Sequence, residues 1–359
     1  MAKEYASILI GTGSAMSLVN PIIEQYEGKI AVIDKDEPGG ICLTRGCIPS
    51  KNLLHPADLV REIQDSHKFG IQASIQEVDF QEVMDRMHSH IDPEIASIER
   101  SLSESEIIDY YREPATFVEP YTLEVGDEII SADQIFLCTG SKPLIPPIKG
   151  LREVDFLTSR SVLDLEAKPE SLIVLGGGYI GMEYAHFFSA MGTEVTVVEM
   201  KSRVLPSEEP EISSLLQEKM EAHMDIITER EVVEVDTTSS GDVEATTEGE
   251  SGKFTLSAEQ LLVASGRAPN TDILDPDKGG IETDSEGWIE VDPHLETSQD
   301  NIWALGDATG KHMFKHVANY EARVVYHNAI LGREMTVNYH AVPHAIFTYP
   351  EVAAVGMRE

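Results

Sequence analysis

Two cysteines stand five residues apart in the stretch GGICLTRGCIPSK, which covers residues 39–51. Cys42 and Cys47 could be buried thiols, part of a metal site or a redox pair. A tetrahedral zinc site needs four ligands, and the third cysteine, Cys138, stands alone in QIFLCTG. We therefore predict no metal, while the redox interpretation stays open beside that of two packed thiols.

Positive charge and an irregular backbone are expected around the second cysteine. Arg45 precedes Cys47 and Lys51 follows it within one helical turn, and a nearby cation favours a thiolate. In an ideal helix, Cα atoms of residues i and i+5 lie roughly 8–9 Å apart. A disulfide needs less than about 7 Å. Gly46 and Pro49 offer the departure from an ideal helix that a bridge would require, and an easily closed, strained pair suits reversible redox chemistry.

Two longer segments share a pattern that would give such a pair its electron source. Residues 5–36 and 170–200 each run from an apolar strand-like stretch through Gly-x-Gly into a helix-length stretch, then a second strand ending in an acid. This is the β-α-β unit that binds a dinucleotide, with the pyrophosphate at the helix N-terminus. Two such units predict two nucleotide-binding domains. FAD with NAD(H) is the simplest pair, with hydride passing from nicotinamide to flavin.

The first glycine motif is incomplete. Gly11 permits the tight turn, and Gly13 lets the backbone approach a pyrophosphate. Met16 stands where a third glycine would pack helix against strand, so a glycine turn in an ordinary α/β domain stays an alternative. Asp34 closes the second strand, where a carboxylate can accept a hydrogen bond from a ribose hydroxyl.

The second glycine motif is complete, with Gly176, Gly178 and Gly181 in LGGGYIGME. Glu199 ends its second strand. A carboxylate at this place favours a free ribose 2′-hydroxyl and repels a 2′-phosphate, so NAD(H) is preferred. Lys201 follows closely, and NADPH stays an alternative.

Composition limits the classes of partner. Sixty-three acidic residues face 27 basic ones, for a net charge of −36, which argues against nucleic acid and anionic membranes as partners. No apolar run reaches membrane-spanning length, and the first residues resemble a strand more than a signal peptide, so we expect a cytoplasmic protein. Residues 78–105 predict an amphipathic helix whose methionines pack in a core.

The cysteine stretch resembles the redox-active segment of the pyridine nucleotide–disulfide oxidoreductases, which include dihydrolipoamide dehydrogenase, glutathione reductase, mycothione reductase and mercuric reductase. FLCTGSKPLIPP, LLVASGRAPNTDIL, NIWALGDATG and KHVANYEARVVYHNAI are similar to further segments of that family, in the same order. The resemblance implies an α/β fold with two Rossmann-like domains. A discontinuous FAD domain (1–149 and 272–338) would hold an inserted NAD(P) domain (150–271), and residues 339–359 would begin a dimerisation domain.

The resemblance also implies roles for single residues. Cys42 would exchange with substrate sulfur and Cys47 would face the flavin. Lys51 would pair with Glu183 beside the flavin, and Tyr179 would cover the nicotinamide pocket. The alternatives are that Glu183 is a solvated helix acid and that Tyr179 only packs. The FAD contacts implied are Gly11, Gly13, Ser14, Asp34, Gly40, Thr139, Gly140, Asp307 and Ala318, and the NAD contacts are Gly176, Gly178, Tyr179, Ile180, Gly181, Glu199 and Gly266.

The expected reaction is of the dihydrolipoamide dehydrogenase type, in which dihydrolipoamide and NAD⁺ give lipoamide and NADH through the Cys42–Cys47 pair. Alternatives are a reductase of a low-molecular-weight disulfide (mycothione, glutathione or bis-γ-glutamylcystine), a mercuric reductase, and a flavin redox module without turnover. The expected partners are a small dithiol or disulfide and, for the full-length protein, a second copy. The family's acid–base histidine would lie beyond this chain. His340 and His344 are expected at the surface or in a hinge, and Cys138 in packing.

Overall fold

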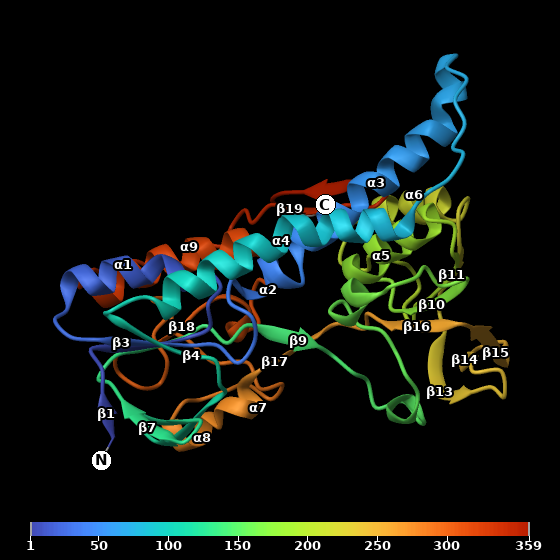
Figure 1. Cartoon of the computed structure of the whole chain (residues 1–359). Helices are drawn as coiled ribbons and strands as arrows, with labels where there is room; N and C mark the ends of the chain where they lie inside the picture. Colours follow the sequence, from blue (N-terminus) through green and yellow to red (C-terminus); the bar gives the residue numbers. More distant parts are fainter. Residues whose placement is uncertain (1, 358–359) are drawn as a thin grey trace. The chain divides into compact units, whose positions relative to one another are not determined.

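The computed structural model describes residues 2–357, which form two compact units (Figure 1). The first contains the chain up to Thr44, Ile91–Lys142 and Arg267–Val342. The second contains Arg45–His90, Pro143–Gly266 and the chain from Pro343 onward. The predicted domain limits differ in assigning residues 45–90 to the first domain, and those limits stay a prediction.

A five-stranded parallel sheet forms the centre of the first unit, in the order β18-β8-β2-β3-β4. The inner strands read as unbroken apolar runs, SILI and IAVI, because both faces of a parallel sheet are covered. Helices α1 and α9 contribute apolar side chains to one core cluster with this sheet. The bounds are β2 Ser7–Ile10, α1 Met16–Gln25, β3 Ile30–Ile33, β4 Ile108–Tyr111, β8 Ile135–Leu137, β18 Ile302–Ala304 and α9 Lys315–Val325.

A second sheet, β1-β7-β6-β5, completes the first unit. Strand β1 runs parallel to β7, whereas β7, β6 and β5 are joined antiparallel. Phe117 and Leu123 are fully buried in the core cluster between the two sheets. The bounds are β1 Lys3–Glu4, β5 Ala115–Glu119, β6 Thr122–Val125, β7 Glu128–Ser131, the paired β9 Ser141–Pro143 and β17 Arg267–Pro269, and the short helices α2 Gly40–Thr44, α7 Thr271–Leu274 and α8 Pro276–Gly279.

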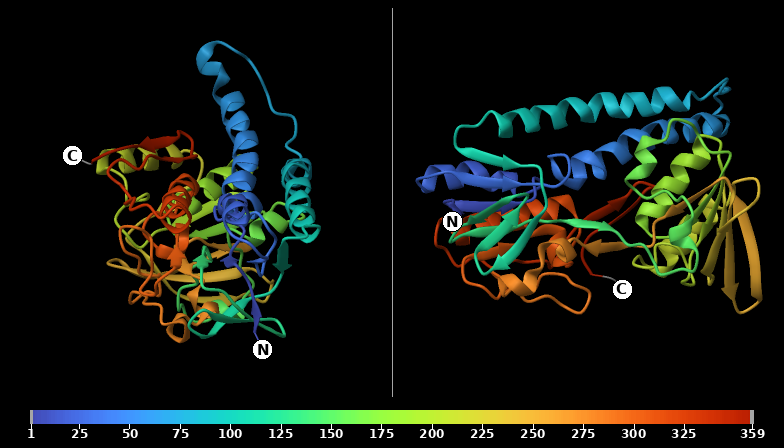
Figure 2. Two further views of the ribbon diagram at one scale, coloured as in Figure 1. Left: turned by 90° about the vertical axis from the view of Figure 1, so that its left-hand side faces the viewer. Right: turned by 60° about the horizontal axis from the view of Figure 1, so that its bottom comes forward.

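The second unit contains a four-stranded parallel sheet, β12-β11-β10-β16, with helix α5 packed beside β11 and α3 packed on α5. Strands β13, β14 and β15 form a separate sheet of three antiparallel strands (Figure 2). The bounds are α3 Cys47–Asp65, β10 Ser171–Leu175, α5 Tyr179–Ala190, β11 Glu194–Val198, α6 Pro210–Met220, β12 Asp225–Ile227, β13 Glu231–Thr237, β14 Val243–Gly249, β15 Gly252–Ala258, β16 Gln260–Val263, β19 His344–Ile346 and β20 Val352–Ala354.

The predicted amphipathic helix is α4, Phe80–Ser103. Met84, Met87 and Ile91 are 1%, 0% and 3% exposed, which confirms that its methionines pack in a core. Within residues 2–357, no helix combines the length and the apolar character that crossing a membrane requires.

Tight packing at the second glycine turn gives a test of the fold. A Cβ on Gly181 would lie 2.0 Å from the carbonyl oxygen of Gly176 and 3.3 Å from Val174. Gly181→Ala should therefore lower the free energy of unfolding by about 1–3 kcal/mol, although alanine is otherwise the better helix former. Urea unfolding followed by circular dichroism measures the change.

Gly178→Ala is the matched control, because a Cβ there meets no atom within 4 Å and the backbone φ of −75° suits alanine. Its stability should stay within about 0.5 kcal/mol of the parent. Equal urea midpoints for the two variants would contradict the packing described for Gly181.

Candidate functional site

Close backbone contacts shape the glycine turn of the first unit. A Cβ on Gly11 would lie 2.1 Å from the carbonyl oxygen of Cys138, and one on Gly40 would lie 2.5 Å from Cα of Gly13. The carboxylate of Asp34 organises the same turn, since its Oδ2 accepts hydrogen bonds from the N–H (2.9 Å) and hydroxyl (2.5 Å) of Thr12. These contacts bring the segments after β2, β3 and β8 together, at the carboxyl ends of parallel strands where nucleotides bind.

Polar groups near this turn fit a flavin dinucleotide. The Oγ1 atom of Thr139 is buried and has no hydrogen-bond partner within residues 2–357. Asp307 accepts a hydrogen bond from the Ser141 hydroxyl (2.5 Å), and Arg267 donates from Nε to the same hydroxyl (2.6 Å). The unpaired Thr139 hydroxyl and the Asp307 carboxylate, both in the first unit, are groups that could bind the hydroxyls of a ribityl chain.

A buried carboxyl that sequence reasoning did not nominate supports the Asp307 loop. Glu321 is 0% exposed and accepts hydrogen bonds from the N–H of Gly306 and the hydroxyl of Tyr339, both at 2.6 Å. Burial raises the pKa of Glu321, and burial together with Glu321 raises the pKa of Tyr339. No local sequence signal marked this pair, because the two residues come from a helix and a loop that only the fold brings together.

The glycine turn of the second unit fits a nicotinamide dinucleotide. A Cβ atom on Gly176 would lie 2.5 Å from the carbonyl oxygen of Ala264. Gly178 directly precedes α5, and a Cβ atom there would meet no atom within 4 Å. Glu199, 6% exposed, follows β11 and accepts hydrogen bonds from the N–H groups of Gly177 (2.7 Å) and Lys201 (2.8 Å). Each carboxylate oxygen has a second lone pair, so Glu199 can still accept ribose hydroxyls.

Lys51 and Glu183, both in the second unit, are brought together. The Nζ atom of Lys51 lies 2.8 Å from each carboxylate oxygen of Glu183 and 4.5 Å from the centroid of the Phe347 ring. The N–H of Phe347 donates to Oε1 of Glu183 at 3.0 Å. Glu183 is 6% exposed, so its charge is compensated by a cation and a backbone donor. The alternative that Glu183 is a solvated helix acid is therefore wrong.

The two cysteines lie on either side of a break in the helix. Cys42 is in α2, which ends at Thr44, and Cys47 begins α3. Gly46 between them has φ −137° and ψ −114°, outside the helical region. Cys42 is half-buried and Cys47 is exposed. The expected irregular backbone is present, whereas the pairing of the thiols and their directions stay predictions because the two residues belong to different units.

The remaining predicted contact residues lie on the same turns and helices. Ser14 is in the first glycine turn, Ala318 is buried in α9, Ile180 is half-buried in α5, and Gly266 follows β16 with φ +129°. Tyr179 is 40% exposed at the start of α5.

Cys138 packs against the apolar cluster of the first unit, and burial raises the pKa of its thiol, in keeping with a packing role. His340 is exposed. His344 differs from expectation, because its Nε2 lies 2.8 Å from Oε1 of the buried Glu208.

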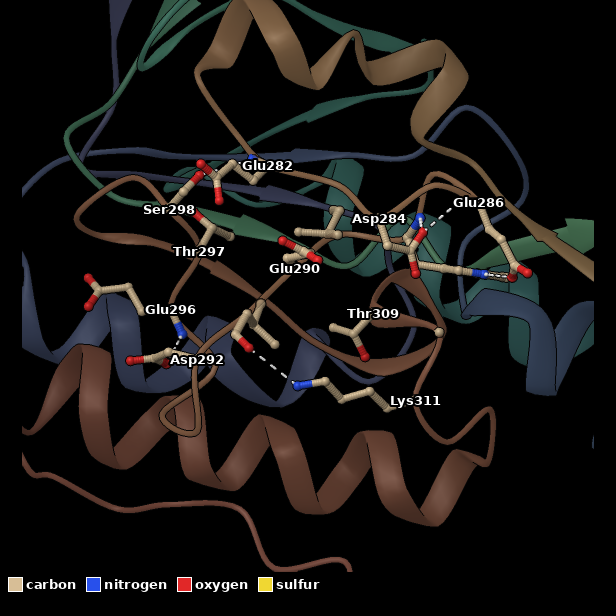
Figure 3. Close-up of a pocket in the computed structure, with 14 residues that line it drawn as sticks. Glu282, Asp284, Glu286, Glu290, Asp292, Glu296, Thr297, Ser298, Thr309 and Lys311 are labelled. Atoms are coloured by element: carbon tan, nitrogen blue, oxygen red, sulfur yellow. Dashed lines mark hydrogen bonds between the residues drawn. The ribbon is translucent and has the colours of Figure 1, made fainter.

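A cavity of about 610 Å³ in the first unit is separate from these residues (Figure 3). Six carboxylates and Lys311 line it, and none of the predicted catalytic or cofactor residues does. Among residues 2–357, no three His, Cys, Asp or Glu side chains are grouped closely enough to hold a metal ion. The carboxylates are Glu282, Asp284, Glu286, Glu290, Asp292 and Glu296.

Several known proteins are similar in sequence to this chain over almost its whole length. The mycothione reductase of Mycobacterium tuberculosis is 35% identical over 99% of this chain and 79% of its own length. The dihydrolipoyl dehydrogenase of Bacillus subtilis is 32% identical over 98% of this chain and 77% of its own. The mercuric reductase of Lysinibacillus sphaericus is 33% identical over 99% of this chain and 65% of its own.

Solved structures agree with this relationship. The HOCl-induced flavoprotein disulfide reductase RclA from Escherichia coli superposes with a TM-score of 0.85 at 30% identity, covering 98% of this chain and 78% of the RclA chain. Residues 5–322 match the family profile of the pyridine nucleotide-disulphide oxidoreductases. That family consists of FAD-dependent enzymes with a nicotinamide nucleotide as electron donor, and it accounts for two Rossmann-like turns in one chain. The chain therefore belongs to the pyridine nucleotide-disulphide oxidoreductase family.

Proposed function

We propose that this protein is an NAD(H)-linked, FAD-dependent disulfide oxidoreductase of the dihydrolipoamide dehydrogenase type. The observation that carries the choice of nucleotide is the carboxylate of Glu199, buried after β11 and fixed by two backbone N–H groups. Its fixed negative charge would repel a ribose 2′-phosphate, whereas its remaining lone pairs would accept hydroxyls. Dihydrolipoyl dehydrogenase is also among the similar proteins.

The proposed thiol chemistry balances within the cysteine pair. A substrate thiolate attacks the sulfur of Cys42 in the oxidised pair, forming a mixed disulfide and releasing Cys47 as a thiolate. The second substrate thiol then attacks the mixed disulfide, releasing the Cys42 thiol and a cyclic disulfide product. FAD held at the first glycine turn would supply the two-electron redox chemistry that links the reduced cysteine pair to NAD⁺. The net reaction gives disulfide, NADH and one proton.

Residues of this chain would stabilise the Cys47 thiolate and orient the two cofactors. Arg45 and the N-terminus of α3 favour a thiolate at Cys47. Lys51, held by Glu183, places a fixed cation in the second unit beside the start of that helix. Asp307 would orient the ribityl hydroxyls. Tyr179, exposed at the start of α5, would cover the nicotinamide pocket.

A second function, reduction of a low-molecular-weight disulfide by a nicotinamide nucleotide, is favoured by a separate observation. Mycothione reductase shows 35% identity to this chain, slightly more than the dihydrolipoyl dehydrogenases do. The same cysteine pair would then run in the opposite direction, with NADPH as an alternative donor because Lys201 stands two residues after Glu199. We propose a cytoplasmic homodimer as the state of the protein for either function.

Steady-state rates with a matrix of substrates separate these functions. The holoenzyme should oxidise dihydrolipoamide with NAD⁺, and it should prefer NADH over NADPH by about tenfold or more in the reverse direction, as expected for one repulsive charge contact. The other substrates to be compared are Hg²⁺ and the oxidised forms of glutathione, γ-glutamylcysteine and mycothiol. Cys42→Ser and Cys47→Ser should each abolish turnover, whereas Cys138→Ser should retain it.

Each result with these substrates would select a different function. Higher kcat/KM with any of the small disulfides than with lipoamide would replace the first function with the second, and reduction of Hg²⁺ alone would indicate a mercuric reductase. Bound FAD without turnover on any substrate would leave a redox module. Full activity of Cys47→Ser would contradict the proposed use of the cysteine pair.

The Lys51–Glu183 pair gives a second test. Lys51→Met leaves the carboxylate of Glu183 buried without its cation, so the free energy of unfolding should fall by about 1–3 kcal/mol, a partial penalty because the Lys51 side chain is 34% exposed. Reduction of the bound flavin by NADH, followed by stopped-flow absorbance, should slow about tenfold or more if the lost cation acts on the reacting groups.

Lys219→Met is the control with the same change of charge, because Lys219 pairs with Glu218 at the surface with side-chain exposures of 52% and 71%. Its stability should change by less than about 0.5 kcal/mol, and its flavin reduction should match the parent. Identical results for the two variants would show that the Lys51 cation has no special role.

A further inference from the structure

We propose that Lys315 binds the pyrophosphate of FAD, adding a cation from α9 to the glycine turn of the first unit. This inference rests on the proposed FAD site. Lys315 is the first residue of α9, and its Nζ donates a hydrogen bond to the hydroxyl of Ser14 at 2.9 Å. The Ser14 hydroxyl in turn donates to Oδ1 of Asn319, also at 2.9 Å. The ammonium group is thereby held on the turn between β2 and α1.

The charge of Lys315 is not compensated by a carboxylate. Its side chain is half-buried, and it forms no ion pair with any acidic group in residues 2–357, although the chain contains 63 acidic residues. The two lysines of the first glycine motif segment differ. Lys29 pairs with Asp109 and Lys35 pairs with Asp36, each at 2.7 Å. Among these three lysines of residues 2–357, Lys315 is therefore the one whose charge no carboxylate pairs, and it lies on this turn.

Backbone N–H groups of the same turn also have no hydrogen-bond acceptor among residues 2–357. The N–H groups of Gly13 and Ser14, both half-buried, make no hydrogen bond within the described part of the chain. Helix α1 begins at Met16 without an acidic side chain in its first turn and without a side-chain cap. Unpaired N–H groups at a ten-residue helix, together with an uncompensated ammonium, make a site for a phosphate.

Electrostatics explain why this chain would need the cation. A pyrophosphate would bring two negative charges to a turn already occupied by the Asp34 carboxylate, in a chain of net charge −36. The helix N-terminus offsets only about half of one charge. An ammonium close to the phosphates offsets a full charge and can act as a hydrogen-bond donor. A purely structural tie between α9 and the turn would stabilise the fold without affecting affinity for phosphate.

FAD titration of the deflavinated protein tests the proposal. Lys315→Met should raise the Kd for FAD about tenfold to a hundredfold at low salt, the effect expected for one charge-assisted hydrogen bond. The difference should narrow as KCl is raised, because ions screen the lost attraction. ADP, which carries a pyrophosphate but no flavin, should lose affinity as a competitor by a similar factor. Lys315→Arg should recover most of the affinity for both compounds.

Lys311→Met is the matched control, since it removes one positive charge from an exposed residue of the same unit whose Nζ contacts the carbonyl oxygen of Val291. Its Kd for FAD should stay within about twofold of the parent. An unchanged Kd in Lys315→Met would overturn the proposal, as would a loss confined to FAD with unchanged ADP binding, which would place Lys315 at the flavin ring. A parent protein that binds no FAD would instead refute the proposed function.

Discussion

Both nucleotide turns depend on glycines that let one backbone segment touch another. At Gly11, Gly176 and Gly181, a Cβ atom would lie 2.0–2.5 Å from a carbonyl oxygen of the neighbouring strand or turn. That closeness brings the acid after the second strand to the turn, where a following helix begins. Asp34 bonds to Thr12 and Glu199 bonds to Gly177 by the same device in the two units.

The acids that close these turns fix the backbone, and we propose that they also select the nucleotide. Each carboxylate accepts backbone N–H bonds and keeps lone pairs for a sugar hydroxyl. In a chain with so many acids, however, every anionic ligand needs nearby donors. The buried Glu321 meets a related demand, because it accepts the N–H of Gly306 and so fixes the backbone before Asp307. We therefore expect the phosphate side of the proposed flavin site to need a cation such as Lys315.

Local sequence patterns predicted individual strands, a helix and the glycine turns, because these depend on residues close together in the chain. Mainly apolar runs identified β2, β3, β10 and β11, a 3.6-residue period identified α4, and glycine spacing identified both turns. The resemblance to a family added the contact between Lys51 and Glu183, which lie 132 residues apart. Gly46 and Pro49 together predicted the irregular backbone between Cys42 and Cys47, and the structure places the break at Gly46.

Contacts set by the path of the chain could not be predicted in the same way. Lys315 meets Ser14 across 301 residues, and Tyr339 meets Glu321 through a loop with no periodic pattern. His344, expected at the surface or in a hinge, pairs with the buried Glu208 because β19 returns to the second unit. No spacing or composition marks such pairs, since their partners are chosen by packing between distant segments.

The central claim is that electrons pass between a nicotinamide nucleotide and the Cys42–Cys47 pair. Counting accessible thiols in the oxidised holoenzyme before and after anaerobic addition of one equivalent of NADH tests it most directly. The account predicts two new thiols per chain in the parent and none in Cys42→Ser or Cys47→Ser. Flavin reduction by NADH with no gain of thiols in the parent would contradict it.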